Sequence, residues 1–288
     1  DAAPGLVQVG HLLGIEVPGA LEGGEAGGVE DLVRVGVADA AEQARIAQGA
    51  LEGVIAFAQA LATTIRRDAE HFETAAIHAG QEPDPATGAA VVPIYQTSTF
   101  VQEAVAKHKG YEYSRTDSPT RHALETCLAA LEGASHCVAF ASGMASITTL
   151  AMTLKTGSKV VFSDDVYGGT WRQVSKVHAR FGVETSAVDL ADLDATRAAL
   201  RDTTRYIWAE TPSNPLLKIL DIAALVELAH EHGAKLVVDN TFATPYLQRP
   251  LELGADLVVH STTKYIGGHS DVVGGAVCTD AATAEELA

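Results

Sequence analysis

The stretch Asp256-Leu-Val-Val-His-Ser-Thr-Thr-Lys264-Tyr-Ile-Gly-Gly-His-Ser270 decides how this chain folds and which chemistry it supports. Its Val-rich beginning predicts a short buried strand, and its Gly-Gly pair predicts a turn. Lys264 follows the strand, directly behind the hydroxyl side chains of Ser261 and Thr263. The pattern therefore places an amine and two hydroxyl groups together at the end of a strand.

A lysine that acts as a nucleophile has to lose its positive charge, and burial near cationic or phosphate-binding groups favours that loss. Hydroxyl groups just before such a lysine are well placed to bind a phosphate. The combination predicts that Lys264 forms a Schiff base with pyridoxal phosphate (PLP). The alternative is an ordinary solvated lysine after a strand, which is the default for any lone lysine.

Short apolar runs alternate with helical patterns from residue 119 onward. Strands are predicted at His136–Ala141, Lys159–Ser163, Glu184–Val188, Tyr206–Ala209, Lys235–Val238 and Asp256–His260. Helices are predicted at Thr120–Glu132, Met144–Leu154, Thr170–Phe181, Leu193–Arg201, Ile222–His232 and Ala281–Ala288. Strands that are apolar on both faces and separated by helices predict an α/β fold, in which helices cover both faces of a mostly parallel sheet.

Polar residues follow the ends of several predicted strands. They are Ser142, Gly143, Tyr167, Glu210, Thr211, Asp239 and the segment from Ser261 to Lys264. In a parallel sheet, ligands bind beyond the carboxyl ends of the strands. Positions that are far apart in the sequence therefore converge on one predicted site.

Eight segments in a fixed order give the chain a family resemblance. They are Pro93-Ile-Tyr-Gln-Thr-Ser-Thr-Phe100, Tyr111-Glu-Tyr-Ser-Arg115, Pro119-Thr-Arg121, Ala139-Phe-Ala-Ser-Gly-Met-Ala145, Asp165-Val-Tyr-Gly-Gly-Thr170, Glu210-Thr-Pro-Ser-Asn-Pro215, Val238-Asp-Asn-Thr-Phe242 and the lysine segment above. One such motif is weak, whereas eight in order are specific. From about Phe72 to its end, the chain resembles the Cys/Met-metabolism PLP enzymes. These include cystathionine γ-synthase, cystathionine γ-lyase, methionine γ-lyase and the O-acylhomoserine sulfhydrylases.

The resemblance implies the type I PLP-dependent transferase fold, which is aspartate-aminotransferase-like, without its C-terminal domain. Residues 71–118 are then an N-terminal arm that contributes to a neighbouring subunit, and residues 119–288 are the large PLP-binding domain. Residues 1–70 match nothing in the family, although Ala38–Arg67 has helical character. A loosely helical or disordered leader, a docking helix and a fused accessory segment are the alternatives for them.

The resemblance also assigns two groups that carry the chemistry. Lys264 would hold PLP and move the proton between Cα and Cβ of the substrate. Asp239 ends a predicted strand and would keep the pyridine nitrogen protonated, which makes the ring an electron sink. The alternative for Asp239 is a turn or helix-cap aspartate, which is common after a strand.

The phosphate is expected at a strand-to-helix turn. Gly143 and Met144 begin a predicted helix, where free backbone N–H groups attract an anion. A Ser-Gly turn alone is weak evidence. Together with Ser261 and Thr263, which follow another strand, it predicts a phosphate-binding cup.

Four further residues match positions that contact the cofactor in the family. Tyr167 is expected to stack on the cofactor ring and to assist proton transfer; otherwise it is a core or rim aromatic. Asn214 is expected at the phenolic oxygen; otherwise it is a turn residue between prolines. Tyr113 and Arg115 are expected to reach the phosphate of the neighbouring subunit, and Arg provides a planar fork for it. Ser118 departs from the family, which usually has Asn in this turn.

Composition excludes several other functions. A net charge of −17 is unfavourable for a nucleic-acid surface. No uninterrupted apolar run is long enough to span a bilayer. The three cysteines and eleven histidines follow no metal-binding spacing, so no metal is expected. A cytoplasmic enzyme with reduced thiols fits these features.

The leading hypothesis is therefore a transsulfuration enzyme that acts on O-acylhomoserine or cystathionine by γ-replacement or γ-elimination. O-acetylhomoserine sulfhydrylase and methionine γ-lyase are the alternatives within the family. A truncated, non-catalytic scaffold with the PLP fold is the alternative from another class. The expected partners are a small amino-acid substrate and further copies of the chain, in a dimer of dimers with shared active sites.

Overall fold

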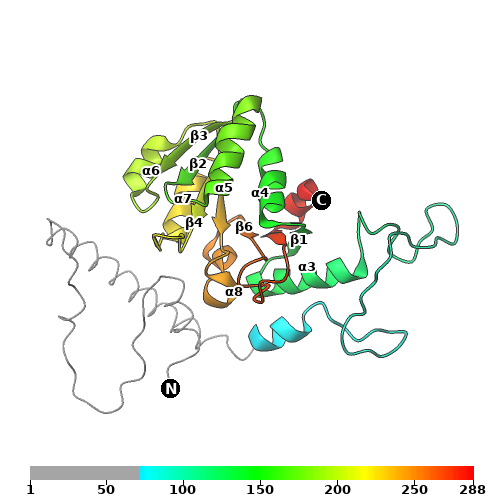
Figure 1. The fold of residues 1–288 in the computed structure, drawn as a ribbon. Coiled ribbons are helices and arrows are strands. Elements are labelled where there is room, and N and C mark those ends of the chain that lie inside the picture. Colours follow the sequence, from blue (N-terminus) through cyan, green and yellow to red (C-terminus); the bar gives the residue numbers. More distant parts are fainter. Residues whose placement is uncertain (1–71) are drawn as a thin grey trace, which may run out of the picture. The chain divides into compact units, whose positions relative to one another are not determined.

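The computed structural model describes residues 72–288 (Figure 1). The leader predicted at residues 1–70, with its helical pattern, lies outside the described residues. Residues 72–78 are helical, and residues 79–118 form a long arm without helices or extended strands. The rest of the chain builds one sheet with its covering helices.

The sheet has seven strands in the order β1-β7-β6-β5-β4-β2-β3. Their bounds are β1 (His136–Phe140), β2 (Lys159–Ser163), β3 (Glu184–Val188), β4 (Thr204–Glu210), β5 (Lys235–Asp239), β6 (Leu257–His260) and β7 (Gly275–Thr279). Strands β2 to β6 pair in parallel, whereas β7 pairs antiparallel with both β1 and β6. The prediction of an α/β fold with a mostly parallel sheet is confirmed.

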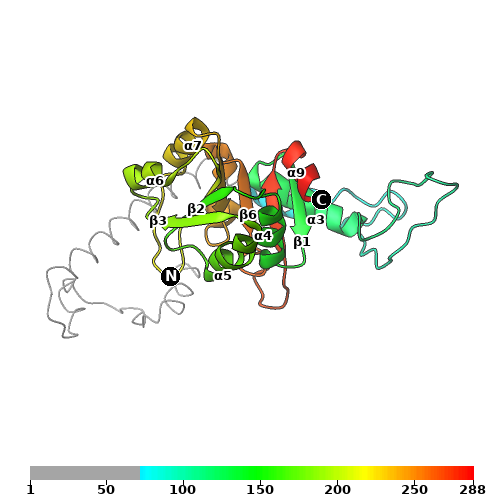
Figure 2. The ribbon, with the colours of Figure 1, turned by 90° about the horizontal axis from the view of Figure 1, so that it is seen from above.

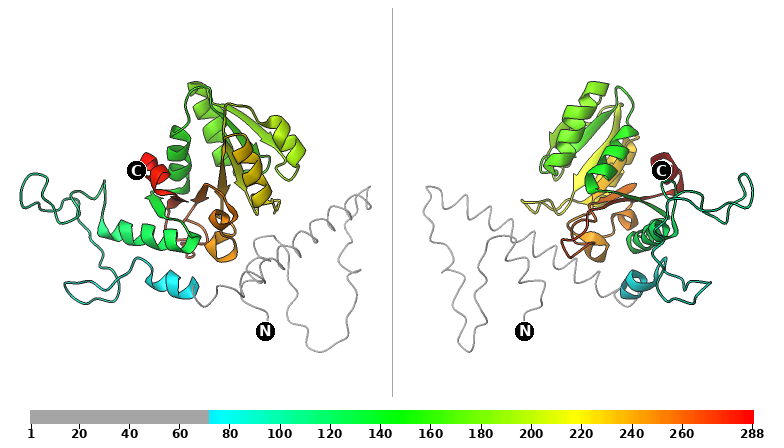
Figure 3. Two further views of the ribbon diagram at one scale, coloured as in Figure 1. Left: turned by 180° about the vertical axis from the view of Figure 1, so that it is seen from behind. Right: turned by 45° about the vertical axis from the view of Figure 1, so that its right-hand side comes forward.

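Helices cover both faces of this sheet, as predicted. Their bounds are α3 (Pro119–Glu132), α4 (Gly143–Met152), α5 (Gly168–Arg172), α6 (Leu193–Ala199), α7 (Ile222–Glu231), α8 (Thr244–Leu247) and α9 (Ala281–Leu287). Figure 2 shows α6 and α7 on the opposite side of the strands from α4 and α5. Helix α9 packs beside β1 and β7 (Figure 3).

Two apolar layers hold the sheet between the helices. Leu225 and Leu228 of α7 pack on one face, against Ile207 among others. Leu150 of α4 packs on the other face, against Phe162 and neighbouring residues. Each of these side chains is at most 3% exposed. Because a fully buried side chain of this size contributes about 1.5–3 kcal/mol, the two layers fix the strands firmly.

The helix predicted at Thr170–Phe181 is wrong in its detail. The segment is divided into α5, a π-helical turn (Gln173–Val177) and a 3₁₀ turn (His178–Phe181). Val174 and His178 are buried, and Trp171 packs edge-on against Phe162. Tertiary packing of these side chains sets the local winding, which the helical period alone does not specify.

The strand β7 was not predicted. It reads Gly275-Ala-Val-Cys-Thr279 and is buried along its whole length. A Gly-rich loop precedes it, and its run of apolar residues is short, so the local pattern favours a loop. The strand nevertheless lies between β1 and β6.

Strand β7 brings the turn after β1 next to the rest of the sheet. A Cβ atom on Gly275 would lie 2.2 Å from the carbonyl oxygen of Ser142 and 2.8 Å from the nitrogen of Gly143. Only glycine allows this close approach of two backbones.

Among residues 72–288, no helix is both long and apolar enough to cross a membrane.

Candidate active site

The site lies at the edge where β4, β5 and β6 end. Glu210 and Asp239 are the last residues of β4 and β5, and they are opposite each other in the register. His260 ends β6, and the segment from Ser261 to Lys264 follows it. Parallel strands thus bring residues from three parts of the chain to one edge, as the sequence predicted.

The N-terminus of α4 provides the predicted anion-binding groups. Ser142 caps the helix, since its Oγ accepts a hydrogen bond from Ala145 N at 3.0 Å. The backbone N–H groups of Gly143 and Met144 have no acceptor within residues 72–288. A Cβ atom on Gly143 would lie 2.9 Å from Ser261 Oγ, so that hydroxyl lies against the helix end. Two N–H groups, the positive end of a helix and a hydroxyl suit a phosphate.

Thr263 lies in the same segment but directs its hydroxyl elsewhere. Its Oγ1 donates to the carbonyl oxygen of Gly274 at 3.1 Å and accepts from Gly274 N at 3.0 Å. The single hydroxyl hydrogen is therefore bound to the backbone. In this conformation Thr263 closes the loop between β6 and β7 and does not offer a donor to a phosphate.

Lys264 follows within a turn made by its own backbone. Lys264 N donates to Ser261 O at 3.1 Å, and Gly268 N donates to Lys264 O at 2.8 Å. The side chain is exposed. The described residues alone do not supply the desolvated position that the sequence predicted for this amine.

Asp239 is buried and tied to the lysine segment. Burial raises the pKa of Asp239, while the hydroxyl and the backbone N–H of Thr241 lower it. Thr241 N donates to Asp239 Oδ1 at 3.1 Å, and Thr241 Oγ1 accepts from Ser261 N at 2.8 Å. One threonine thus holds the carboxylate in a fixed position relative to the residues before Lys264.

Tyr167 forms a partly open aromatic surface beside the helix end. A Cβ atom on Gly169 would lie 2.3 Å from Tyr167 Cε1 and 2.9 Å from Met144 Sδ, so these two side chains meet over that glycine. Tyr167 is 52% exposed. A flat ring can therefore approach it from the solvent side.

Asn214 lies on the loop after β4, and its side chain is exposed. Asp165 fixes this loop, because Asp165 Oδ2 accepts from Ser213 Oγ at 2.5 Å and from Leu216 N at 3.3 Å. The loops after β2 and β4 are thereby joined. The structure brings Asn214 to the same sheet edge as Tyr167.

Glu210 is a site residue whose role the sequence analysis did not identify. It appeared there only as a polar residue at a strand end. Its Oε2 accepts from Tyr167 N at 2.6 Å, and its Oε1 accepts from Asn214 N at 3.3 Å. Burial first, and the neighbouring Asp239 second, raise the pKa of Glu210 to about 8. A glutamate that ends a buried apolar strand was the available signal.

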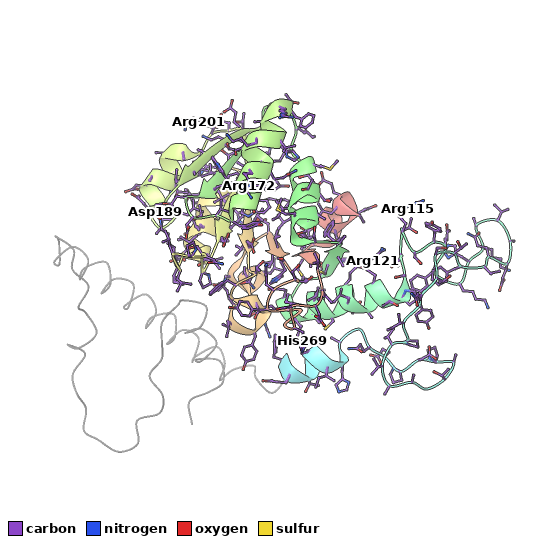
Figure 4. The ribbon with its side chains drawn as sticks, viewed as in Figure 1. Arg115, Arg121, Arg172, Asp189, Arg201 and His269 are labelled. Carbon is purple, nitrogen blue, oxygen red and sulfur yellow. The ribbon has the colours of Figure 1, made fainter. Side chains whose placement is uncertain are left out.

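Tyr113 and Arg115 lie on the arm, apart from the residues at the strand ends. The Arg115 guanidinium stacks over the Tyr113 ring at 4.8 Å, and both side chains are exposed. Figure 4 shows Arg115 on the arm, before Arg121 at the beginning of α3. Ser118 caps α3 by accepting from Arg121 N at 3.2 Å, so the departure from Asn preserves an N-cap.

Three side chains on the arm and α3 form the one group of possible metal ligands in residues 72–288. They are the carboxylates of Asp117 and Glu125 and the imidazole of His122. Arg121 pairs with both carboxylates, at 3.5 Å from Asp117 and 3.4 Å from Glu125. The positive charge beside these two carboxylates is therefore the guanidinium group of Arg121.

The arrangement at the strand ends fits PLP. The cup formed by Gly143, Met144 and Ser261 suits the phosphate, and buried Asp239 suits a protonated ring nitrogen. Fold and site together define the cofactor-binding domain of a PLP-dependent enzyme.

Comparison with known proteins gives the family. The Cys/Met metabolism PLP-dependent enzyme family matches residues 73–288, and the chain belongs to it. A probable cystathionine γ-synthase of Herpetosiphon aurantiacus is 61% identical over 208 residues, which are 72% of this chain and 65% of that protein. A cystathionine β-lyase of Coxiella burnetii is 52% identical over 220 residues, which are 75% of this chain and 57% of that protein.

A solved structure agrees with these sequence matches. The crystal structure of metB from Corynebacterium glutamicum has a TM-score of 0.74 and 52% identity. The match covers 75% of this chain and 57% of that structure. The chain thus spans about half to two-thirds of the length of the relatives that it matches.

Proposed function

We propose that the protein is a PLP-dependent transsulfuration enzyme of the cystathionine γ-synthase or γ-lyase type. It would act by γ-replacement or γ-elimination on O-acylhomoserine or cystathionine. The observation that carries the proposal is the convergence of Lys264, Asp239 and the cup at Gly143 and Ser261 on one sheet edge. Membership of the family supports it.

The residues would share the binding of the cofactor as follows. Gly143, Met144 and Ser261 would bind the phosphate, and Asp239 would pair with the ring nitrogen. Tyr167 would stack on the ring, and Asn214 would contact its phenolic oxygen. Thr263 reaches the phosphate only if its hydroxyl leaves Gly274.

When bound, PLP supplies an electron sink for negative charge that develops at Cα of the substrate. Lys264 would then act as the acid–base group. Its amine, once free of its own proton, would take the proton from Cα, pass it on, and then take a proton from Cβ, so that the substituent on Cγ can leave with the electron pair of its bond. Asp239 would keep the ring nitrogen protonated, and the Tyr167 ring would keep water away from one face of the bound cofactor.

The neighbouring subunit would complete the site. The described part of the arm, residues 72–118, exposes apolar side chains, with Val101 91% and Val105 fully exposed. An exposed apolar surface of this kind is typical of an interface. We place Tyr113 and Arg115 at the partner's phosphate, in a cytoplasmic homo-oligomer built as a dimer of dimers, with residues 119–288 as the large domain.

Cystathionine γ-synthase chemistry has the stronger support, because the probable γ-synthase is 61% identical and the β-lyase 52%. The β-lyase is a third chemistry beyond the two that the sequence suggested. O-acetylhomoserine sulfhydrylase would differ from cystathionine γ-synthase in its nucleophile, and methionine γ-lyase would differ from it in its substrate. A scaffold without catalysis is disfavoured because Lys264, Asp239 and Tyr167 are all present.

The test combines labelling with a substrate assay. Borohydride reduction of the PLP-loaded protein should attach the pyridoxyl group to Lys264, which peptide mass mapping locates. O-acylhomoserine and cysteine should give cystathionine, whereas oxoacid and ammonia from cystathionine would indicate a lyase. Labelling of another lysine, or no adduct, would contradict the assignment.

A further inference from the structure

Glu210 connects two loops that begin at different strands. Its Oε2 accepts from Tyr167 N on the loop after β2, and its Oε1 accepts from Asn214 N on the loop after β4. The side chain is 7% exposed. Neither N–H group has another acceptor among residues 72–288. One buried carboxyl group thus fixes the backbone at both residues.

We propose that Glu210 is a positioning residue that sets the distance between Tyr167 and Asn214. In the proposed function, on which this inference rests, Tyr167 lies on the face of the cofactor ring and Asn214 at its phenolic oxygen. Glu210 would therefore hold the slot for the ring in shape before the cofactor arrives. Its role is in geometry, and it touches neither substrate nor cofactor.

The chemistry of the side chain explains why a glutamate is needed. Each carboxyl oxygen can accept one of the two N–H groups, and a buried donor without a partner is costly. Glutamine has the same shape, but its NH₂ group would face one of the two N–H groups, donor against donor. Aspartate keeps the carboxyl group but is one methylene shorter, so it cannot reach both loops.

The charges around Glu210 agree with this role. Asp239 on β5 is its register neighbour, and Asp165 on the loop after β2 also raises its pKa, which lies at about 8. Burial and these two carboxyl groups therefore all disfavour the charged form of Glu210, and burial also raises the pKa of Asp239.

The chain provides a matched control at the rim of the same two loops. Lys218 Nζ contacts Asp164 Oδ2 at 2.8 Å, and Lys218 also lies 3.6 Å from Asp189. This ion pair joins the loops after β2 and β4, as Glu210 does, but it is partly exposed and does not contact Tyr167 or Asn214. Lys218→Met removes this link, together with the contact to Asp189, and leaves Glu210 and its two hydrogen bonds in place.

Hydrogen exchange in the apoprotein tests whether Glu210 holds the two loops together, and it needs neither cofactor nor activity. Glu210→Gln should lower the protection of the Tyr167 and Asn214 amides at least tenfold, measured at residue resolution. Lys218→Met should leave both amides as in the wild type. Unchanged protection in Glu210→Gln, or an equal loss in Lys218→Met, would overturn the proposal. If Glu210→Gln does not fold, Glu210→Asp is measured in the same way.

Titration with PLP provides the second readout. The dissociation constant of PLP should rise at least tenfold in Glu210→Gln, and the circular dichroism of the bound cofactor should change because Tyr167 is displaced. Lost amide protection with an unchanged PLP affinity and spectrum would also overturn the positioning role. If the wild type itself binds no PLP, the proposed function fails. The exchange experiment still decides whether Glu210 holds the two loops in place.

Discussion

Replacing Glu210 by glutamine should change how the stability of the apoprotein depends on pH. The pKa of Glu210 rises from its ordinary value of 4.5 to about 8 in the folded protein, through burial and the neighbouring Asp239. The folded state therefore binds a proton that the unfolded state has released. Between these two values stability should fall as pH rises, and below 4.5 the contribution is fully present.

The magnitude follows from the size of the shift. One pH unit corresponds to about 1.4 kcal/mol, so the three units from about pH 5 to about pH 8 correspond to roughly 4 kcal/mol. Wild-type apoprotein should lose about this much unfolding free energy over that range through Glu210 alone. Glu210→Gln has no titrating proton at this position, so its curve should be flatter by roughly the same amount.

Urea denaturation at a series of pH values measures the difference. Titrations at sites remote from Glu210 are common to both proteins and cancel in the comparison. Glu231 provides the control, because it is an exposed carboxylate whose pKa Arg197 lowers, so Glu231→Gln should not flatten the curve. Parallel wild-type and Glu210→Gln curves between pH 5 and pH 8 would refute the reasoning.

Three further results are expected. Asp239→Ala should retain PLP but lose turnover by roughly a hundredfold or more, since the ring nitrogen loses its partner; near-normal kcat would remove Asp239 from the site. Gly143→Ala should destabilise the protein by about 1–3 kcal/mol, because the new Cβ would lie 2.7 Å from Ser261 Cβ. Adding Ser261→Gly should restore most of this stability in denaturation experiments, and no recovery would contradict the steric explanation. Mixing Arg115→Ala with Lys264→Ala chains should restore partial activity through hybrid sites, and proven hybrids without activity would exclude a shared site.

The sequence predicted the parts of the fold that depend on local pattern. The strand before Lys264 and the turn at Gly143 could be located because apolar runs, glycines and strand ends are visible in the chain itself. Their meeting at one edge follows from parallel strand order. The β7 strand could not be found in this way, because its place in the sheet depends on pairing with β6 and with β1, and β1 is more than a hundred residues away.

Side-chain orientation was the other part that the sequence did not reveal. The pattern placed Thr263 beside the phosphate, yet its hydroxyl bonds to Gly274 across a loop whose closure is a tertiary event. The sequence placed Glu210 at a strand end. Its role became visible only in the structure, where its two carboxyl oxygens accept hydrogen bonds from Tyr167 N and Asn214 N. Sequence motifs identify which residues meet at the site, whereas three-dimensional packing decides which of their polar atoms remain available to bind a ligand.

The position of β7 also affects the order in which the protein can assemble. Among the described strands, β1 pairs with β7 alone, with Cys137 opposite Cys278 in the register. The sheet pairing that fixes β1 and the turn at Ser142 is therefore incomplete until a segment more than 130 residues later has been synthesised and has inserted. Contacts this distant in sequence form slowly, because a long loop has to close first. During synthesis the phosphate cup should be among the last features to form, so PLP would capture a nearly finished fold and would not nucleate it.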